Sequence, residues 1–202
     1  MAVSYSKGQG MSSLIPPLPP TPTNEIYGTL VSGVNEGMLQ KLMNVIAIAA
    51  SNKVDRIHLL MHSTGGFVND GIAGYNFLRT LPLDVILYNV GSIQSIASVM
   101  FLGANKRKAS KAATFMIHRS HFSSPIPASS AQLHAVAQSL ALDDSRMEEI
   151  LRSHITMPAD KWEIHKHADL FLTAQDALSY GIIDEIADFA PPLGATLFNV
   201  VS

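Results

Sequence analysis

The sequence predicts an α/β fold built on a largely parallel sheet. Short apolar segments rich in β-branched residues alternate with longer segments whose apolar residues recur at helical spacing, and polar or glycine-containing turns separate them. Strands that alternate with helices in this way usually join one parallel sheet, because each helix carries the chain back across it. The alternation runs from about residue 25 to residue 118.

The strands and helices of this region follow from their apolar patterns. Strands are expected at residues 25–31, 56–62, 84–90 and 113–118. Helices are expected at residues 35–50, 70–81 and 95–103. The first helix is typical, because its apolar residues recur at the spacing of one buried helix face: Met38, Leu39, Leu42, Val45 and Ile46.

A long helix is expected at about residues 129–155. Ser129 and Gln132 have the spacing of a capping box, and the stretch that follows contains neither Gly nor Pro. An approximate apolar stripe runs along it at Leu133, Val136, Leu140, Met147, Ile150 and Leu151. Because such a helix exceeds the width of an α/β body, we expect it to project and to pack against a partner. An ordinary surface helix, broken at Asp143-Asp144, is the alternative.

Two shorter elements are expected near the C-terminal end. Thr173 and Asp176 have the spacing of a second capping box, and Gly181 is expected to end that helix as its C′ residue. A final strand is expected over residues 182–186, and residues 191–202 are expected to form a tail.

The first 23 residues are expected to form a flexible arm. Proline fills most of positions 16–22, which favours extended polyproline geometry and excludes a helix. A spacer is the usual role of such an arm, and an SH3-type ligand is the alternative. The folded domain is therefore expected to span residues 24–190.

The composition limits the classes of function. The chain has 202 residues, enough for one domain with a sizeable core. Hydrophobic residues make up 47% and charged residues 15%, so apolar surface is expected to be buried against other subunits. The net charge of −2 gives no reason to expect nucleic acid binding. The basic cluster Lys106-Arg107-Lys108 with Lys111 is expected to be a solvated loop.

The sequence gives no sign of a disulfide, a cofactor or a membrane segment. Cysteine is absent, which excludes thiol nucleophiles and cysteine metal sites. The pair His165 and His167 does not share a helix face, so a surface position is expected rather than a metal site. No apolar run reaches the roughly 18 residues of a spanning helix, and no signal peptide is visible. We therefore expect a cytoplasmic protein without membrane association.

Ser95 is the candidate nucleophile. It follows an apolar strand and Gly91, and it precedes a short apolar helix. A serine at such a turn presents its hydroxyl at an edge, and the free N–H groups of the helix N-terminus favour an oxyanion there. A plain helix N-cap is the alternative.

His118 and Asp169 are the candidate base and orienting residue. A neutral imidazole at the end of the strand 113–118 is suited to taking a proton from a serine near neutral pH. A carboxylate would accept from the imidazole Nδ1–H and fix its tautomer. Ser95, His118 and Asp169 in this order are therefore predicted to form a catalytic triad.

The pair Gly65-Gly66 is the candidate oxyanion and substrate segment. Two glycines after an apolar strand let the backbone approach a ligand closely. The N–H groups of Gly65 and Ile96 are predicted to form the oxyanion hole, and Gly66 is predicted to bind substrate. A simple tight turn is the alternative.

Four motifs of the chain, taken in order and spacing, resemble those of the ClpP family, the proteolytic subunits of Clp proteases. They are Met61-His62-Ser63-Thr64-Gly65-Gly66, Gly91-x-x-x-Ser95, Phe115-Met116-Ile117-His118 and Asp169-x-Phe171-Leu172-Thr173-Ala174, the last continued by Ala177, Tyr180-Gly181 and Ile183-Asp184. The resemblance covers roughly residues 25–187. Thr64 replaces the family's usual proline, and Arg119-Ser120-His121 replaces its Gln-Pro.

This resemblance implies a serine endopeptidase of the ClpP/crotonase fold, a repeated β-β-α superhelix with a projecting handle helix. It implies the triad Ser95, His118 and Asp169, donors at Gly65 and Ile96, and no metal or organic cofactor. It further implies heptameric rings, which can stack around a chamber, and in which peptides or unfolded proteins bind as an added strand. The Pro-rich arm gives no sign of the family's axial loops, so an AAA+ unfoldase partner stays open.

Two other functions stay open beside the peptidase. A ring subunit whose triad is retained but latent would show the same sequence. A crotonase-type acyl-CoA enzyme would use the same scaffold and glycine donors without needing the three residues.

Overall fold

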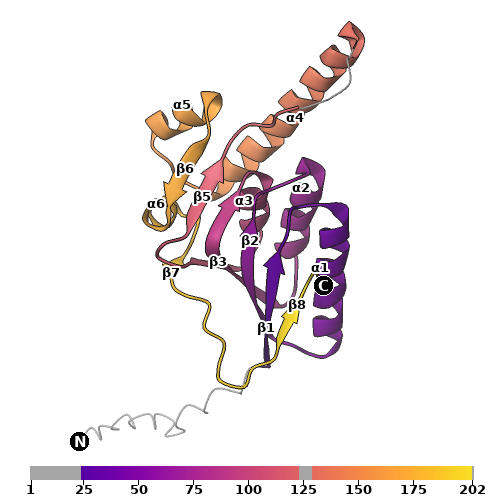
Figure 1. The fold of residues 1–202 in the computed structure, drawn as a ribbon, viewed down its shortest axis with the longest axis vertical. Coiled ribbons are helices and arrows are strands. Elements are labelled where there is room, and N and C mark those ends of the chain that lie inside the picture. The colour runs from indigo at the N-terminus through magenta and orange to yellow at the C-terminus, as the bar shows by residue number, and fades with distance from the viewer. Residues whose placement is uncertain (1–23, 123–128, 202) are drawn as a thin grey trace, which may run out of the picture.

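The computed structural model describes residues 24–122 and 129–201, so the predicted arm lies outside the described residues. These residues form one mixed α/β unit (Figure 1). Its strands are β1 (Glu25–Val31), β2 (Arg56–Ser63), β3 (Asp84–Gln94), β4 (Lys106–Ala109), β5 (Thr114–Ile117), β6 (Leu170–Thr173), β7 (Glu185–Ile186) and β8 (Leu197–Asn199). Its helices are α1 (Glu36–Ser51), α2 (Val68–Leu78), α3 (Ile96–Phe101), α4 (Ser130–His154), α5 (Ala159–His167) and α6 (Ala174–Tyr180).

The sheet is parallel except at one edge. Its strand order is β6-β5-β3-β2-β1-β8, and β4 pairs with β3 and β7 outside this path. Strand β3 is long enough to pair first with β4, at Ile86 to Asn89, and then with β5, at Ser92 to Gln94. Only the β5–β6 pair among the described strands is antiparallel. The predicted α/β fold with a largely parallel sheet is confirmed.

Glycines of α2 set the position of α3. A Cβ at Gly71 would lie 2.2 Å from Cγ1 of Ile96, and one at Gly74 would lie 2.9 Å from Sδ of Met100. Larger residues would push the two helices apart, since packed interiors leave no room for an added methyl group. This close packing fixes the first turn of α3 and, with it, Ser95, which precedes the helix.

The basic residues 106–108 belong to strand β4, so the predicted solvated loop is wrong for them, whereas Lys111 lies in an exposed turn as predicted. The strand pairs in parallel with β3 and β7. Arg107 and Lys108 form ion pairs with Asp184 and Glu185, at 3.3 and 2.8 Å. The backbone of β4 thus extends the sheet, while the charged ends of its side chains contact the carboxylates of residues 184 and 185. The pairing of β4 with β7 is long-range, so a local run of basic residues does not predict it.

Besides β4, three elements have no counterpart among the predicted ones, namely α5, β6 and β8. Strand β8 lies in the predicted tail and pairs in parallel with β1, with Phe198 opposite Gly28. Val200, which follows it, is buried. The predicted final strand is shorter than expected: only Glu185–Ile186 form β7, while Ile182 and Ile183 are buried before it.

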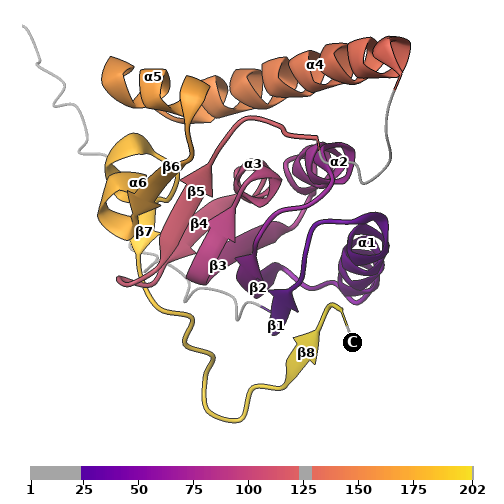
Figure 2. The same cartoon turned by 45° about the horizontal axis from the view of Figure 1, so that its top comes forward.

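Helix α4 is continuous and projects from the body (Figures 1 and 2). Ser129 caps it through a capping box with Gln132. Met147 and Leu151, in its second half, are buried, whereas Leu133 and Leu142 are exposed. The helix is not broken at the two aspartates, and its first half is uncovered in the single chain. No helix in the described part of the chain is both long and apolar enough to cross a membrane.

Replacing Gly28 with alanine is expected to release β8. A Cβ there would lie 2.4 Å from the Phe198 ring, and the ring has to leave its place over β1. We expect the free energy of unfolding to fall by only about 1–2 kcal/mol, because the rest of the sheet is untouched. Hydrogen exchange should accelerate over residues 197–201 and stay unchanged in β2. Gly37→Ala, whose added Cβ would meet only Oδ1 of Asn35 at an ordinary contact distance of 3.4 Å, is the control. Unchanged exchange in β8 of the Gly28 variant would contradict the prediction.

Candidate active site

Ser95 connects β3 to α3 in a strained backbone conformation. Its φ is 56° and its ψ is −135°, values that non-glycine residues rarely adopt. Its N–H donates to the carbonyl of Met116 at 2.7 Å, and its carbonyl accepts from the N–H of Ser98 at 2.9 Å. Such strain costs about 1–3 kcal/mol and persists only where the surroundings enforce it. The hydroxyl of Ser95 is therefore held at one place.

The surroundings that enforce this conformation are buried. The Ser98 hydroxyl, which is buried, lies 3.2 Å from the carbonyl oxygens of both Ile93 and Met116. It therefore ties the end of β3, the edge of β5 and the first turn of α3 into one unit. This junction is what carries the turn at Ser95.

His118 lies beside the Ser95 hydroxyl. The pairing of Gln94 with Met116 brings the ends of β3 and β5 together, and His118 follows β5 directly. Its Nε2 lies 2.8 Å from Oγ of Ser95, and its side chain is 15% exposed. This is the contact that a nucleophile and its base require.

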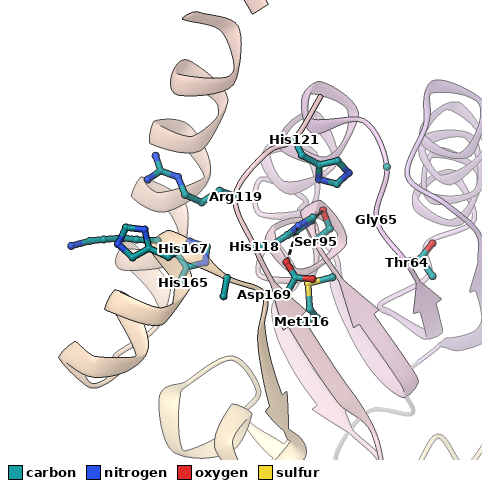
Figure 3. A pocket seen from close by; sticks show the side chains of 13 residues that line it. Thr64, Gly65, Ser95, Met116, His118, Arg119, His121, His165, His167 and Asp169 are labelled. Carbon is teal, nitrogen blue, oxygen red and sulfur yellow. Dashed lines mark hydrogen bonds and ion pairs between the residues drawn. The ribbon is translucent and has the colours of Figure 1, made fainter. Parts of the chain in front are cut away.

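Asp169 reaches His118 from the antiparallel edge of the sheet. The pair Ile117 and Leu170 sets residues 118 and 169 next to each other. Oδ1 of Asp169 lies 3.5 Å from Nδ1 of His118, and the Asp169 side chain is 52% exposed. Figure 3 shows the three predicted residues, Ser95, His118 and Asp169, in one row. The histidine–aspartate contact is looser than the serine–histidine contact.

The charge state of His118 follows from its surroundings. Burial is the largest influence and lowers its pKa from the ordinary 6.5. The carboxylate of Asp169 opposes this, and His121, whose ring centroid lies 5.1 Å away, lowers the pKa further. The imidazole is therefore neutral near pH 7 and able to accept a proton.

The turn at Gly65-Gly66 lies directly against Ser95. The two glycines have φ values of 95° and 156°. The carbonyl of Gly65 accepts from the N–H of Val34 at 2.8 Å, and the N–H of Phe67 donates to the carbonyl of Val34 at 2.9 Å. These two bonds hold the turn in place, with Gly65 next to the Ser95 side chain.

The N–H groups around Ser95 differ in whether they already have acceptors. The N–H of Gly65 donates to the hydroxyl of Ser63 at 3.3 Å. Within residues 24–122 and 129–201, no acceptor is found for the N–H of Gly66. Ile96 is the first residue of α3, so its N–H has no acceptor within the helix. Among the described residues around Ser95, the N–H groups of Gly66 and Ile96 are thus left without an acceptor.

A cavity of about 780 Å³ opens at these residues. The turn Thr64-Gly65-Gly66 lines it together with Ser95 and His118, and residues 165–169 line it too. Its size lies within the range of about 300–1,000 Å³ that is usual for ligand pockets. No group of three or more His, Cys, Asp or Glu in the described chain is arranged to hold a metal ion.

Asp144 holds the chain after His118, a role that the sequence analysis missed. Its Oδ2 accepts from Nε of Arg119 at 2.8 Å, and its Oδ1 accepts from the N–H of Ser120 at 2.6 Å. The carboxylate thereby ties the segment beyond His118 to α4. No spacing signal connects residues 25 positions apart, and the Asp143-Asp144 pair was expected only as a possible helix break.

His165 is buried, so its predicted surface position is wrong, whereas His167 is exposed as predicted. The His165 side chain packs edge-on against Trp162, with 5.9 Å between the ring centroids. Burial lowers its pKa, and its Nδ1 has no hydrogen-bond partner among the described residues. The apolar packing by Trp162 explains why a polar residue of this short helix faces inward.

Comparison with known protein families shows to which family the chain belongs. The sequence model described as Clp protease matches residues 24–189. The chain belongs to the Clp protease family. The match covers β1 to β7 and the whole of α4, whereas β8 lies beyond it. The predicted resemblance and the ClpP/crotonase fold class are confirmed. Clp protease family members generally act on proteins and assemble into rings.

Proposed function

We propose that the protein is a serine endopeptidase with Ser95 as nucleophile, His118 as base and Asp169 as orienting residue. The observation that carries the proposal is the 2.8 Å contact between Oγ of Ser95 and Nε2 of His118, made by a serine in a strained strand-to-helix turn. Family membership agrees with it. Strain retained at a nucleophile is typical of a position selected for reaction rather than stability.

The chemistry follows in two stages. Nε2 of His118 takes the proton of the Ser95 hydroxyl as Oγ attacks the peptide carbonyl carbon. The same proton passes to the leaving nitrogen when the C–N bond breaks, which leaves an acyl-serine. Water then gives a proton to His118 and attacks the acyl carbon, and the serine regains its proton as the acid product leaves. Asp169 stabilises the imidazolium in each stage.

Backbone N–H groups would stabilise the oxyanion of both stages. The N–H of Ile96 is one donor, and the Gly65-Gly66 turn supplies the other. Because the N–H of Gly65 already donates to Ser63, we take the N–H of Gly66 as the second donor. Loss of one such donor typically lowers turnover by about 10²–10³-fold.

The substrates that fit are extended peptides or unfolded protein segments. Such a chain would lie beside the Gly65-Gly66 turn as an added strand and be held by main-chain hydrogen bonds. We further propose heptameric rings, which can stack, and in which the uncovered half of α4 packs against a partner copy. Exposed Leu133 and Leu142 support this, since large apolar side chains on a projecting helix favour burial in an interface. Neither a metal nor an organic cofactor is needed.

A latent form is the second candidate, and one distance favours it. The 3.5 Å separation between His118 and Asp169, with the carboxylate half exposed, is long for an orienting hydrogen bond. In this form the single chain holds the nucleophile and base ready, and assembly into a ring shortens the contact. Activity would then rise with the fraction of assembled protein.

Labelling with a serine-directed fluorophosphonate tests the proposal. We expect one adduct, located on Ser95 by mass spectrometry, and loss of that adduct in His118→Ala. Labelling should be measured across the oligomers separated by size, since the latent form predicts adducts only in the assembled fraction. A folded, assembled protein that forms no adduct would refute the serine mechanism.

The pH dependence of labelling is expected to follow His118. Its lowered pKa places the midpoint of His118 protonation below pH 6.5. The labelling rate should therefore be flat near pH 8 and fall to half of its maximum only below pH 6.5. In Asp169→Asn the midpoint should move lower still, because the carboxylate that raises the pKa is gone. A midpoint above 6.5 would contradict the assignment.

A further inference from the structure

A second, smaller cavity adjoins Ser95 on the side of α2 and α4. Its volume is about 280 Å³, just under the usual range of about 300–1,000 Å³ for ligand pockets, so it suits one side chain. Ser95, His118 and His121 line it at the reacting end. Its other walls include the apolar side chains Phe67, Val68, Leu140 and Met147.

Asp143 is the acidic residue in the lining of this cavity. Its side chain is 18% exposed. Oδ1 accepts from Nη1 of Arg146 at 3.2 Å, and the same Nη1 donates to Oδ1 of Asn69 at 2.8 Å. This bridge between α4 and α2 holds the carboxylate at the wall. Within the described residues, Oδ2 of Asp143 has no partner.

The bridge leaves the carboxylate able to bind a second cation. The 3.2 Å bond to Arg146 is longer than the roughly 2.7–2.9 Å of a strong charge-assisted hydrogen bond. Arg146 is also drawn toward Asn69, and it does not line the cavity. Because its side chain is only 18% exposed, the free carboxylate oxygen attracts a donor more strongly than a fully exposed carboxylate does.

We propose that this cavity receives the side chain of the substrate residue whose carbonyl Ser95 attacks, and that Asp143 makes lysine and arginine the preferred residues there. The inference rests on the proposed function. A long cationic side chain lays its apolar stem along Phe67, Val68, Leu140 and Met147 and brings its charged end to Oδ2 of Asp143. Acidic side chains are repelled, and leucine or methionine fills the apolar part but leaves the carboxylate without a partner.

Two phosphonate probes that differ only at this residue, lysine in one and leucine in the other, test the proposal. Both form the same adduct with the Ser95 hydroxyl, so the ratio of their labelling rates reports the cavity alone. We expect the wild-type ratio to favour lysine and the ratio in Asp143→Asn to fall about tenfold or more. Because each ratio is taken within one preparation, the fraction of folded protein cancels.

Two further variants serve as a control and as a test of reversed preference. Glu149→Gln removes an exposed carboxylate from the same helix and should leave the ratio unchanged. Asp143→Leu should turn the preference to leucine even where it lowers the total rate. The role of Asp143 is overturned if the wild-type ratio favours leucine, or if Asp143→Asn leaves the ratio unchanged. In either case, labelling of Ser95 by one of the probes still upholds the serine mechanism. Labelling by neither probe overturns the mechanism and this inference with it.

Discussion

Replacing Ser95 with alanine is expected to lower kcat/KM for peptide hydrolysis by about 10⁴-fold or more. The hydroxyl is the proposed nucleophile, and a histidine left without it offers water only weak assistance. The measurement is cleavage of a fluorogenic peptide by full-length protein at matched oligomeric state. Ser51→Ala is the control, because this hydroxyl is exposed at the end of α1 and lines neither cavity beside Ser95. Retained hydrolysis in Ser95→Ala would contradict the assignment of the nucleophile.

Stability measurements on the same position separate strain from chemistry. At φ 56°, alanine keeps the backbone strain of Ser95, whereas glycine relieves it. The free energy of unfolding of Ser95→Gly should therefore be about 1 kcal/mol higher than that of Ser95→Ala, although both variants are expected to be inactive. Equal stabilities would mean that the turn is not strained in solution, and the nucleophile would have to be held by other means.

Local signals predicted those elements whose ends are fixed by their own residues. The capping boxes at Ser129 and Thr173 mark the starts of α4 and α6, and Gly181 ends α6 in the left-handed conformation, with φ 82°. Each of these signals acts within a few residues. A pattern in the sequence is then enough, because no distant segment is needed to satisfy the backbone.

Elements that depend on distant partners were not predictable in this way. The sequence of β4 shows only a run of basic residues, and its strand conformation depends on pairing with β3 and β7. Strand β8 pairs with β1 about 170 residues earlier, and its Phe198 fits because position 28 is glycine. The entropy cost of closing such long loops is offset only by the contacts of the complete sheet, so local sequence propensity does not predict these pairings.

Some features of the candidate site were likewise predictable from the sequence, and others were not. The order of Ser95, His118 and Asp169 was visible in the sequence, and the strand pairings bring all three together. Which glycine offers a free N–H was not visible, because the answer lies in the bond from Gly65 to Ser63. The place of Asp143 in the wall of the smaller cavity was not visible either, since it depends on the contacts of α4 with α2 and α3.

Replacing Gly65 with alanine is expected to lower labelling of Ser95 and peptide hydrolysis by about 10²-fold or more. An added Cβ would lie 2.6 Å from Cβ of Ser95 and 3.1 Å from its Oγ, so either the turn or the nucleophile has to move. The φ of 95° also disfavours alanine, with an expected loss of about 1–3 kcal/mol in the free energy of unfolding. A displacement of about 1 Å at a reacting group is enough to cost 10²-fold in rate. The measurements are kcat/KM, labelling rate and denaturant unfolding.

Gly33→Ala is the matched control, because a Cβ there would meet only the carbonyl oxygen of Gly65, at a normal contact distance of 3.4 Å. It adds the same methyl group to the opposite side of the same turn, so it should retain both stability and labelling. A fall in stability without a fall in the activity of the remaining folded Gly65→Ala protein would mean that the turn supports the fold but does not position Ser95. Loss of activity in excess of the unfolded fraction is what the close approach of Gly65 to the serine predicts.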